Sequence, residues 1–207
     1  MQNLQDRILR ELGRAPFTAD VLKSRFGGLR KPLQKAQTLA DSGAIIRLKR
    51  GLYCVSPEVS GVQPNRMMVA NALMGPSYVS AEYALSHYGL IPERVMEVTS
   101  VVARRGKNFD TPLGRFSFRT VLGKVFPIGV RSRDGVLMAG PEKALCDYLD
   151  LRRNLRITSP TTLRDFLWRD VRLDFDAVPD WDRSVFAAYA ACGYKTPLFN
   201  ALAEVFA

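Results

Sequence analysis

The chain has 207 residues, of which 47% are hydrophobic and 24% charged, as in a globular protein with one or two domains. The formal net charge is +10, and residues 1–56 hold 11 Lys and Arg against 4 Asp and Glu. No apolar run approaches the roughly 20 residues needed to cross a bilayer, and three scattered cysteines argue against a disulfide framework. We therefore expect a cytoplasmic protein whose N-terminal quarter attracts nucleic acid rather than a membrane.

Three helices are predicted first. Apolar residues recur at helical spacing between residues 4 and 12, and Thr18 can cap a second helix that ends near Arg25. Gly27 and Gly28 form a turn into a third helix, expected over residues 29–42. One side of this helix is apolar and can pack inward, with Leu29, Leu33, Ala36 and Ala40. The other side carries Arg30, Lys31, Gln34, Lys35, Gln37 and Thr38.

A hairpin with a positively charged tip follows the basic helix. Residues 44–48 and 52–55 have the composition of strands, and Lys49, Arg50 and Gly51 between them form a tight turn. On its own, the basic helix is equally consistent with an ordinary surface helix exposed to solvent. The basic hairpin that follows it favours the interpretation as a DNA-binding module. The order of helix, glycine turn, basic helix and hairpin is that of a winged helix-turn-helix, which we expect over residues 1–57.

The residue types on this module predict how it would contact double-stranded DNA. The expected DNA-binding residues are Arg30, Lys31, Gln34, Lys35, Arg47, Lys49 and Arg50. The first three lie near the start of the basic helix, where Arg and Lys can pair with guanine and Gln with adenine. Lys35 is expected to bind phosphate, and the hairpin residues to contact the backbone or the minor groove. Two copies would bind an inverted repeat.

The rest of the chain predicts a second domain over residues 62–207, after a linker rich in Pro and Gly at residues 56–65. Its elements mix helices and strands, so the fold class is α+β, with a mixed α/β C-terminal domain. Helices are expected at residues 67–73, 80–89 and 141–151, and as three segments after residue 161 broken by Pro179 and Pro197. Strands are expected at residues 95–103, 115–121, 126–130 and 136–138, with a basic loop at residues 104–108.

Enzymatic chemistry finds little support in the sequence. His87 is the only histidine, which excludes HExxH zinc sites, and on its predicted helix it is expected to be a packed or hydrogen-bonded structural residue. Glu142, Asp147 and Asp150 share a predicted helix and could suggest a metal site, although a solvated helix face, or an N-terminal charge that interacts favourably with the helix dipole, is favoured. No CxxC, P-loop or GxGxxG motif occurs. We therefore expect no catalytic residues, no metal and no cofactor.

Three segments of the second half resemble the AbiEi antitoxin family. They are residues 78–92, residues 98–119 with a basic pair inside, and residues 139–147, which contain Pro-Glu-Lys-Ala-Leu. The resemblance implies an antitoxin and transcriptional autorepressor of a type IV toxin–antitoxin system, sometimes acting in phage defence. It also implies a winged helix-turn-helix that binds inverted repeats in its own promoter. The C-terminal domain would counter a cognate AbiEii-like nucleotidyltransferase toxin without a stable complex being required.

Two alternatives stay open at this point. The chain could be a protein-interaction module that acts through its C-terminal domain, with DNA binding incidental. A nuclease or nucleotidyltransferase would need a clustered acidic metal site, and none is evident. The basic strip of Arg104, Arg105 and Lys107 could be a second phosphate contact, a docking surface for the toxin or its RNA substrate, or a solvated loop.

Overall fold

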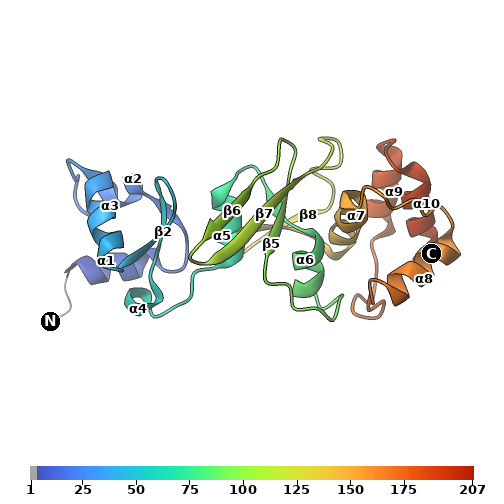
Figure 1. Cartoon of the computed structure of the whole chain (residues 1–207), viewed down its shortest axis with the longest axis horizontal. Helices are drawn as coiled ribbons and strands as arrows, with labels where there is room; N and C mark the ends of the chain where they lie inside the picture. Colours follow the sequence, from blue (N-terminus) through green and yellow to red (C-terminus); the bar gives the residue numbers. More distant parts are fainter. Residues whose placement is uncertain (1–3) are drawn as a thin grey trace.

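The computed structural model describes residues 4–207, and within them the chain forms an α+β fold of ten helices and two β-sheets. The molecule is elongated, with a small N-terminal module at one end, a larger sheet in the middle and three helices at the other end (Figure 1). The N-terminal elements are α1 (Leu4–Leu12), β1 (Phe17–Thr18), α2 (Ala19–Arg25), α3 (Pro32–Asp41), β2 (Ile45–Lys49) and β3 (Leu52–Val55).

The central and C-terminal parts follow a short helix, α4 (Pro57–Ser60). The central elements are α5 (Arg66–Leu73), β4 (Tyr78–Val79), α6 (Ala81–His87), β5 (Val98–Val102), β6 (Asn108–Thr111), β7 (Gly114–Thr120), β8 (Val130–Arg133) and β9 (Val136–Ala139). The remaining helices are α7 (Pro141–Leu151), α8 (Pro160–Arg169), α9 (Arg183–Ala191) and α10 (Thr196–Val205). The expected helices at 67–73, 141–151 and after residue 161 are confirmed within a few residues.

The N-terminal module packs three helices on a three-stranded antiparallel sheet of order β1-β3-β2. Apolar residues from all three helices, among them Leu9, Leu22 and Leu39, share one core with Ile45 and Tyr53 of the hairpin. The expected hairpin is confirmed, and Gly51 supplies the positive φ of +77° that its turn requires. This module is therefore built around the sheet, with α3 lying against β2.

The hairpin belongs to two hydrophobic cores. Every residue of β3 is buried, and because side chains alternate along a strand, its two faces pack against different partners. Tyr53 and Val55 lie in the N-terminal core. Leu52 and Cys54 lie instead in a second core, shared with α5 and with β5 and β7 of the large sheet. The N-terminal module is thus packed directly onto the centre of the molecule.

The segment expected to be a linker is also ordered. Residues 57–60 form α4, which contacts α1. The Arg10 Nε donates to the Val59 carbonyl at 2.9 Å, and the Asn65 N–H donates to the Arg14 carbonyl at 3.1 Å. The predicted linker is therefore irregular mainly at residues 61–65, because Pro57 starts a helix at its first position, where its missing N–H costs nothing.

The large sheet has six strands in the order β6-β7-β5-β4-β9-β8 and mixes parallel with antiparallel pairs. Helix α5 and the hairpin pack on one face through the core that holds Val98 and Val102, while Val101 belongs to the core containing α6 and α7. One predicted strand was wrong, because residues 126–129 form turns. The edge strand β6 was not predicted, and it begins at the last residue of the expected basic loop, Asn108.

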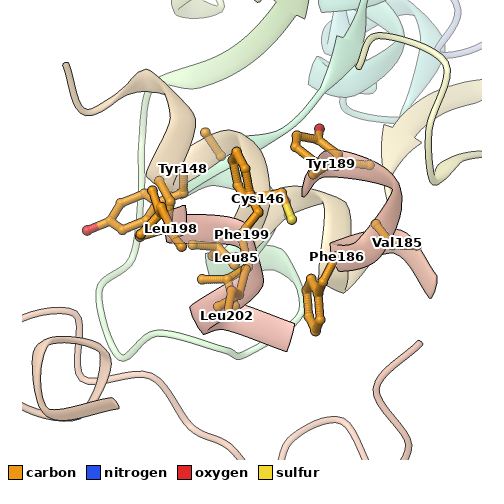
Figure 2. Packing of buried hydrophobic residues seen from close by; sticks show 14 of the residues in the cluster. Leu85, Cys146, Tyr148, Val185, Phe186, Tyr189, Leu198, Phe199 and Leu202 are labelled. Carbon is orange, nitrogen blue, oxygen red and sulfur yellow. The ribbon is translucent and has the colours of Figure 1, made fainter. Parts of the chain in front are cut away.

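Helix α7 is enclosed on all sides, and its charged residues are buried. Glu142, Lys143 and Asp147 expose only 2%, 0% and 0% of their surface. The prediction of a solvated acidic face was therefore wrong, because α6 and β9 cover one side of α7 and α9 covers another. Glu142 does lie in the first turn of α7, where a negative charge favours the helix dipole. Figure 2 shows the apolar part of this enclosure, where Cys146 of α7 lies among side chains of α6, α9 and α10.

The buried charges of α7 satisfy one another. The Lys143 Nζ donates to the Val125 carbonyl at 2.8 Å and to the Tyr189 hydroxyl at 2.7 Å, and lies 3.7 Å from Asp147 Oδ1. Asp147 accepts hydrogen bonds from the Ser80 and Tyr189 hydroxyls, each at 2.6 Å. Burial lowers the pKa of Lys143, and the Asp147 carboxylate opposes that shift. The network fastens α7 to the start of α6 and to α9.

Removing one partner of a buried ion pair leaves the other charge uncompensated, at a cost of about 3–5 kcal/mol. We expect Asp147→Ala to lower the free energy of unfolding by about that amount, measured by urea denaturation. The double variant Lys143→Met, Asp147→Leu removes both charges and should be clearly more stable than Asp147→Ala. If Asp147→Ala unfolds at the same urea concentration as the parent, the network does not support the fold.

Candidate nucleic-acid interface

Helix α3 begins three residues later than expected. It starts at Pro32, so Arg30 and Lys31 precede it, and Lys31 is its N-cap residue. Its buried positions are Ala36 and Leu39, and Leu33 is 58% exposed. The predicted inward stripe was therefore wrong at Leu33, because Leu29 lies outside the helix and no longer fixes which side faces the core.

The outer side of α3 is polar and open. Gln34, Gln37 and Thr38 are exposed there, as are Arg30 and Lys31 just before the helix. The Thr38 hydroxyl donates to the main-chain carbonyl of Gln34 at 3.1 Å, and the Gln37 side-chain amide donates to Asp41 Oδ1 at 2.7 Å. Figure 1 shows α3 at the end of the molecule, on the side of the module away from the six-stranded sheet.

Lys35 has a structural contact that the sequence did not reveal. Its Nζ donates to Gln5 Oε1 at 2.6 Å and lies 5.4 Å from the centre of the Phe26 ring. The side chain is half-buried and connects α3 to α1 and to the turn after α2. Lys35 is therefore less available for phosphate than the exposed Arg30 and Lys31.

The hairpin tip is divided between solvent and protein. Arg47 and Arg50 are exposed. The Lys49 Nζ instead donates to the Leu73 carbonyl at 2.7 Å, at the end of α5, and lies 6.0 Å from the centre of the Phe109 ring. Lys49 is thus not at a free wing tip, because the hairpin packs onto the second core and carries this side chain with it.

The basic loop at residues 104–107 lies beside the same aromatic ring. The Lys107 Nζ is 5.0 Å from the centre of the Phe109 ring, and Arg105 is exposed. Arg104 donates to the Gly75 carbonyl at 2.8 Å. The structure therefore brings the cations of this loop close to the hairpin tip, although more than 50 residues separate them in the sequence.

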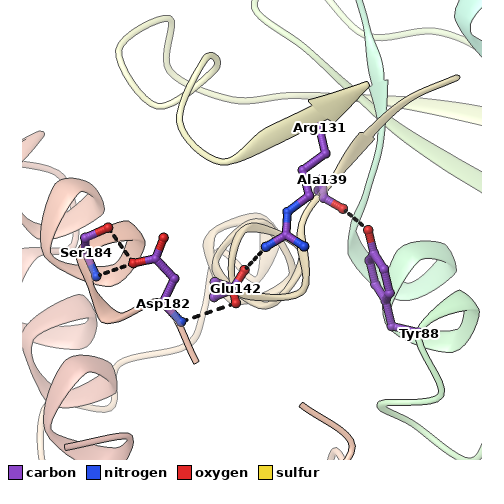
Figure 3. Close-up of polar contacts among 6 residues, drawn as sticks. All are labelled: Tyr88, Arg131, Ala139, Glu142, Asp182 and Ser184. Atoms are coloured by element: carbon purple, nitrogen blue, oxygen red, sulfur yellow. Dashed lines mark hydrogen bonds and ion pairs between the residues drawn. The ribbon is translucent and has the colours of Figure 1, made fainter. Parts of the chain in front are cut away.

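The residues considered for enzymatic chemistry are dispersed. His87 is exposed, with its ring 5.5 Å from that of Tyr88, so the expectation of a packed histidine was wrong. Figure 3 shows that Glu142 accepts from Arg131 at 3.2 Å and from the Asp182 backbone N–H at 3.3 Å. Asp147 is held in the network with Lys143. Within residues 4–207, no three His, Cys, Asp or Glu side chains are arranged to hold a metal ion.

No protein-family model matches the chain, and no curated protein sequence matches it. No helix in the described part of the chain combines the length and apolar character that membrane crossing requires. The candidate interface therefore stands on its own geometry: the open side of α3, its N-terminal flank, and the exposed arginines of the hairpin.

The two cations at the hairpin tip should behave differently on substitution. Lys49→Ala removes a hydrogen bond to a buried carbonyl and an aromatic contact, and should lower the free energy of unfolding by about 1–2 kcal/mol. Arg50→Ala, one residue away, should change it by less than about 0.5 kcal/mol. Urea denaturation of both variants measures this. Equal stabilities would mean that Lys49 is as free as Arg50.

Asp150, near the end of α7, should make the free energy of unfolding depend on pH. Burial raises the pKa of its carboxyl from 3.8 to about 6, against the opposing attraction of Lys195. Because the folded state holds the proton more tightly, its stability should fall as pH rises from about 4 to about 6 and stay lower above that range. Asp150→Asn should remove this fall and be more stable at pH 7. Urea denaturation across this range tests it, and an unchanged slope would contradict it.

Proposed function

We propose that the N-terminal module is a winged helix-turn-helix and that the chain is a DNA-binding antitoxin and transcriptional autorepressor of a type IV toxin–antitoxin operon. The observation that carries the proposal is the open polar side of α3 with Arg30 and Lys31 at its start. It belongs to the quarter of the chain that holds most of the net positive charge. A helix that buries its apolar side and exposes such residues suits the major groove.

The start of α3 is the part we propose to enter the major groove. Arg30, Lys31 and Gln34 would contact base edges, since these residue types pair with guanine and adenine. Leu33, exposed at the first turn, adds an apolar group that suits a thymine methyl. Arg47 and Arg50 of the hairpin would contact phosphates. Lys35 and Lys49 drop out of this set, because their ammonium groups already have protein partners.

Attachment of the hairpin to the second core favours recognition by a rigid unit. Leu52 and Cys54 fix the hairpin against the central sheet, so the module would present α3 in one orientation. When two copies bind an inverted repeat, their relative position would then be determined by the spacing of the half-sites and not by a flexible linker. The basic loop near the hairpin tip would lie close to the same duplex.

The antitoxin part of the proposal depends on the resemblance of the second half to the AbiEi family. Under it, the chain acts in the cytoplasm and counters an AbiEii-like nucleotidyltransferase toxin, in some systems as a defence against phage. The residues that carry the resemblance support a role in folding, because Lys143 and Asp147, both within residues 139–147, are held in the buried network. No catalytic role, metal or cofactor is proposed for them.

Variants of two arginines test the DNA interface in complementary ways. Arg30→Ala should cost about 1–3 kcal/mol of binding to the native upstream region and relax sequence preference at one position. Arg50→Ala should weaken binding to all sequences similarly and reduce the slope of log affinity against log salt by about one. Gel-shift titrations at several salt concentrations, with the native region and scrambled DNA, measure both effects.

Arg169→Ala is the matched control, because this arginine is exposed at the end of α8, at the opposite end of the molecule from α3 (Figure 1). It should bind as the parent does. If the parent bound native and scrambled DNA equally at every salt concentration, the autorepressor proposal would be wrong. The chain would then fit better as an interaction module acting through its C-terminal domain.

A further inference from the structure

A second candidate site lies far from α3. A cleft of about 1220 Å³ opens between the sheet, at β5 and β7, and the C-terminal end of α7. Thr99 and Arg119 come from the sheet side, and because Thr99 is in register with Ser117, two residues before Arg119, their side chains share one face. This face is opposite to the one that packs on α5 and the hairpin. The cleft thus lies away from α3, and the basic loop, through Gly106 and Lys107, forms part of its lining.

One wall of the cleft is a fixed arrangement of cation and aromatic rings. The Arg152 guanidinium lies 4.3 Å from the Tyr148 ring and 5.8 Å from the Phe166 ring, and it also donates to the Tyr148 hydroxyl. Arg153 and the exposed Tyr194 lie beside it on the cleft lining. Because these contacts hold Arg152 in place, little conformational entropy would be lost when an anion binds.

On the same wall, Asp150 carries a carboxylate oxygen that accepts no hydrogen bond from the protein. Its side chain is 7% exposed, and its Oδ1 is buried without a hydrogen-bond partner. The nearest cation, Lys195 Nζ, lies 3.8 Å from that oxygen and donates instead to the carbonyls of Asp150 and Arg152 at 2.6 and 3.1 Å. A buried carboxylate oxygen without a donor is costly. Asp150 also lines the cleft, so a ligand that reached this carboxyl group and donated a hydrogen bond to it would be favoured.

We propose that this cleft binds a nucleoside phosphate unit, with the phosphate at the arginines and the base or ribose donating to Asp150. The arginines of the cleft would bind the phosphate, and the exposed Tyr194 could stack on the base. The Asp150 carboxylate would accept a hydrogen bond from an amino, imino or hydroxyl group of the base or ribose. A plain inorganic anion would leave Asp150 without a donor, and an apolar ligand would leave the charges without partners. The volume exceeds that needed for one nucleotide, so the unit could be a free nucleotide or the end of a single strand.

Calorimetric titration of the full chain tests the proposal. The probes are ATP, GTP, CTP, UTP and a 5′-phosphorylated RNA hexamer, each at low salt and without promoter DNA. At least one should bind, and Arg119→Ala should weaken that binding by about tenfold or more, since a charge-assisted contact is lost. Equal affinities for nucleotide and hexamer would indicate a single-unit ligand, and tighter hexamer binding would indicate a strand end. Either result supports the site.

Two further variants keep the test specific to the cleft. Asp150→Asn preserves shape, removes a buried charge and should weaken binding by at least about threefold, because a neutral acceptor replaces a charged one. Arg133→Ala alters an exposed arginine on β8, at the opposite edge of the sheet from β6, and should bind as the parent does. The proposal is overturned if no probe binds at millimolar concentration, or if Arg119→Ala and Arg133→Ala bind alike. Promoter binding is measured separately, so either proposal can fail alone.

Discussion

The packing of the β2–β3 hairpin into two cores is the constraint on which the arrangement of this molecule depends. One face of β3 completes the N-terminal module, and the other lies against α5 and the large sheet. Each fully buried leucine contributes about 1.5–3 kcal/mol relative to exposure, and Leu48 and Leu52 are both buried on the second side. Hinge motion between the module and the sheet would expose these leucines, so the orientation of α3 is set by ordinary apolar burial.

The opposite half of the molecule is fastened by polar groups instead. Lys143 and Asp147 are fully buried, and their partners Ser80 and Tyr189 come from distant parts of the sequence. Such a network does not exceed a well-packed apolar core in stability, but it requires a particular arrangement of partners. It thereby defines how α6, α7 and α9 fit together. The position of the α7 end, and with it Asp150 and Arg152 in the cleft, follows from that arrangement.

Local patterns in the sequence predicted the helices and strands well. They predicted poorly which side chains are buried and which residues they contact. The bounds of α7 followed from Pro141 and from apolar spacing, and the hairpin from its strand composition and Gly51. The burial of the α7 charges did not follow, because their partners lie about 40–70 residues away and serine and tyrosine have no distinctive pattern. The internal hydrogen bond of Lys49 could not be predicted, because its acceptor is a backbone carbonyl, which has no sequence signature. The exposure of Leu33 depends on the residue at which α3 begins. Periodicity alone placed that first residue three positions too early.

The double burial of β3 also bears on how the chain would be removed from a cell. If a protease opened the N-terminal module, one side of the central core would be exposed to solvent. If the large sheet unfolded, the hairpin would lose the residues that pack on its second face. The two halves should therefore unfold in a single cooperative transition, with no stable fragment left behind. Under the proposed repressor role, clearance would then end DNA occupancy and every C-terminal activity at the same moment.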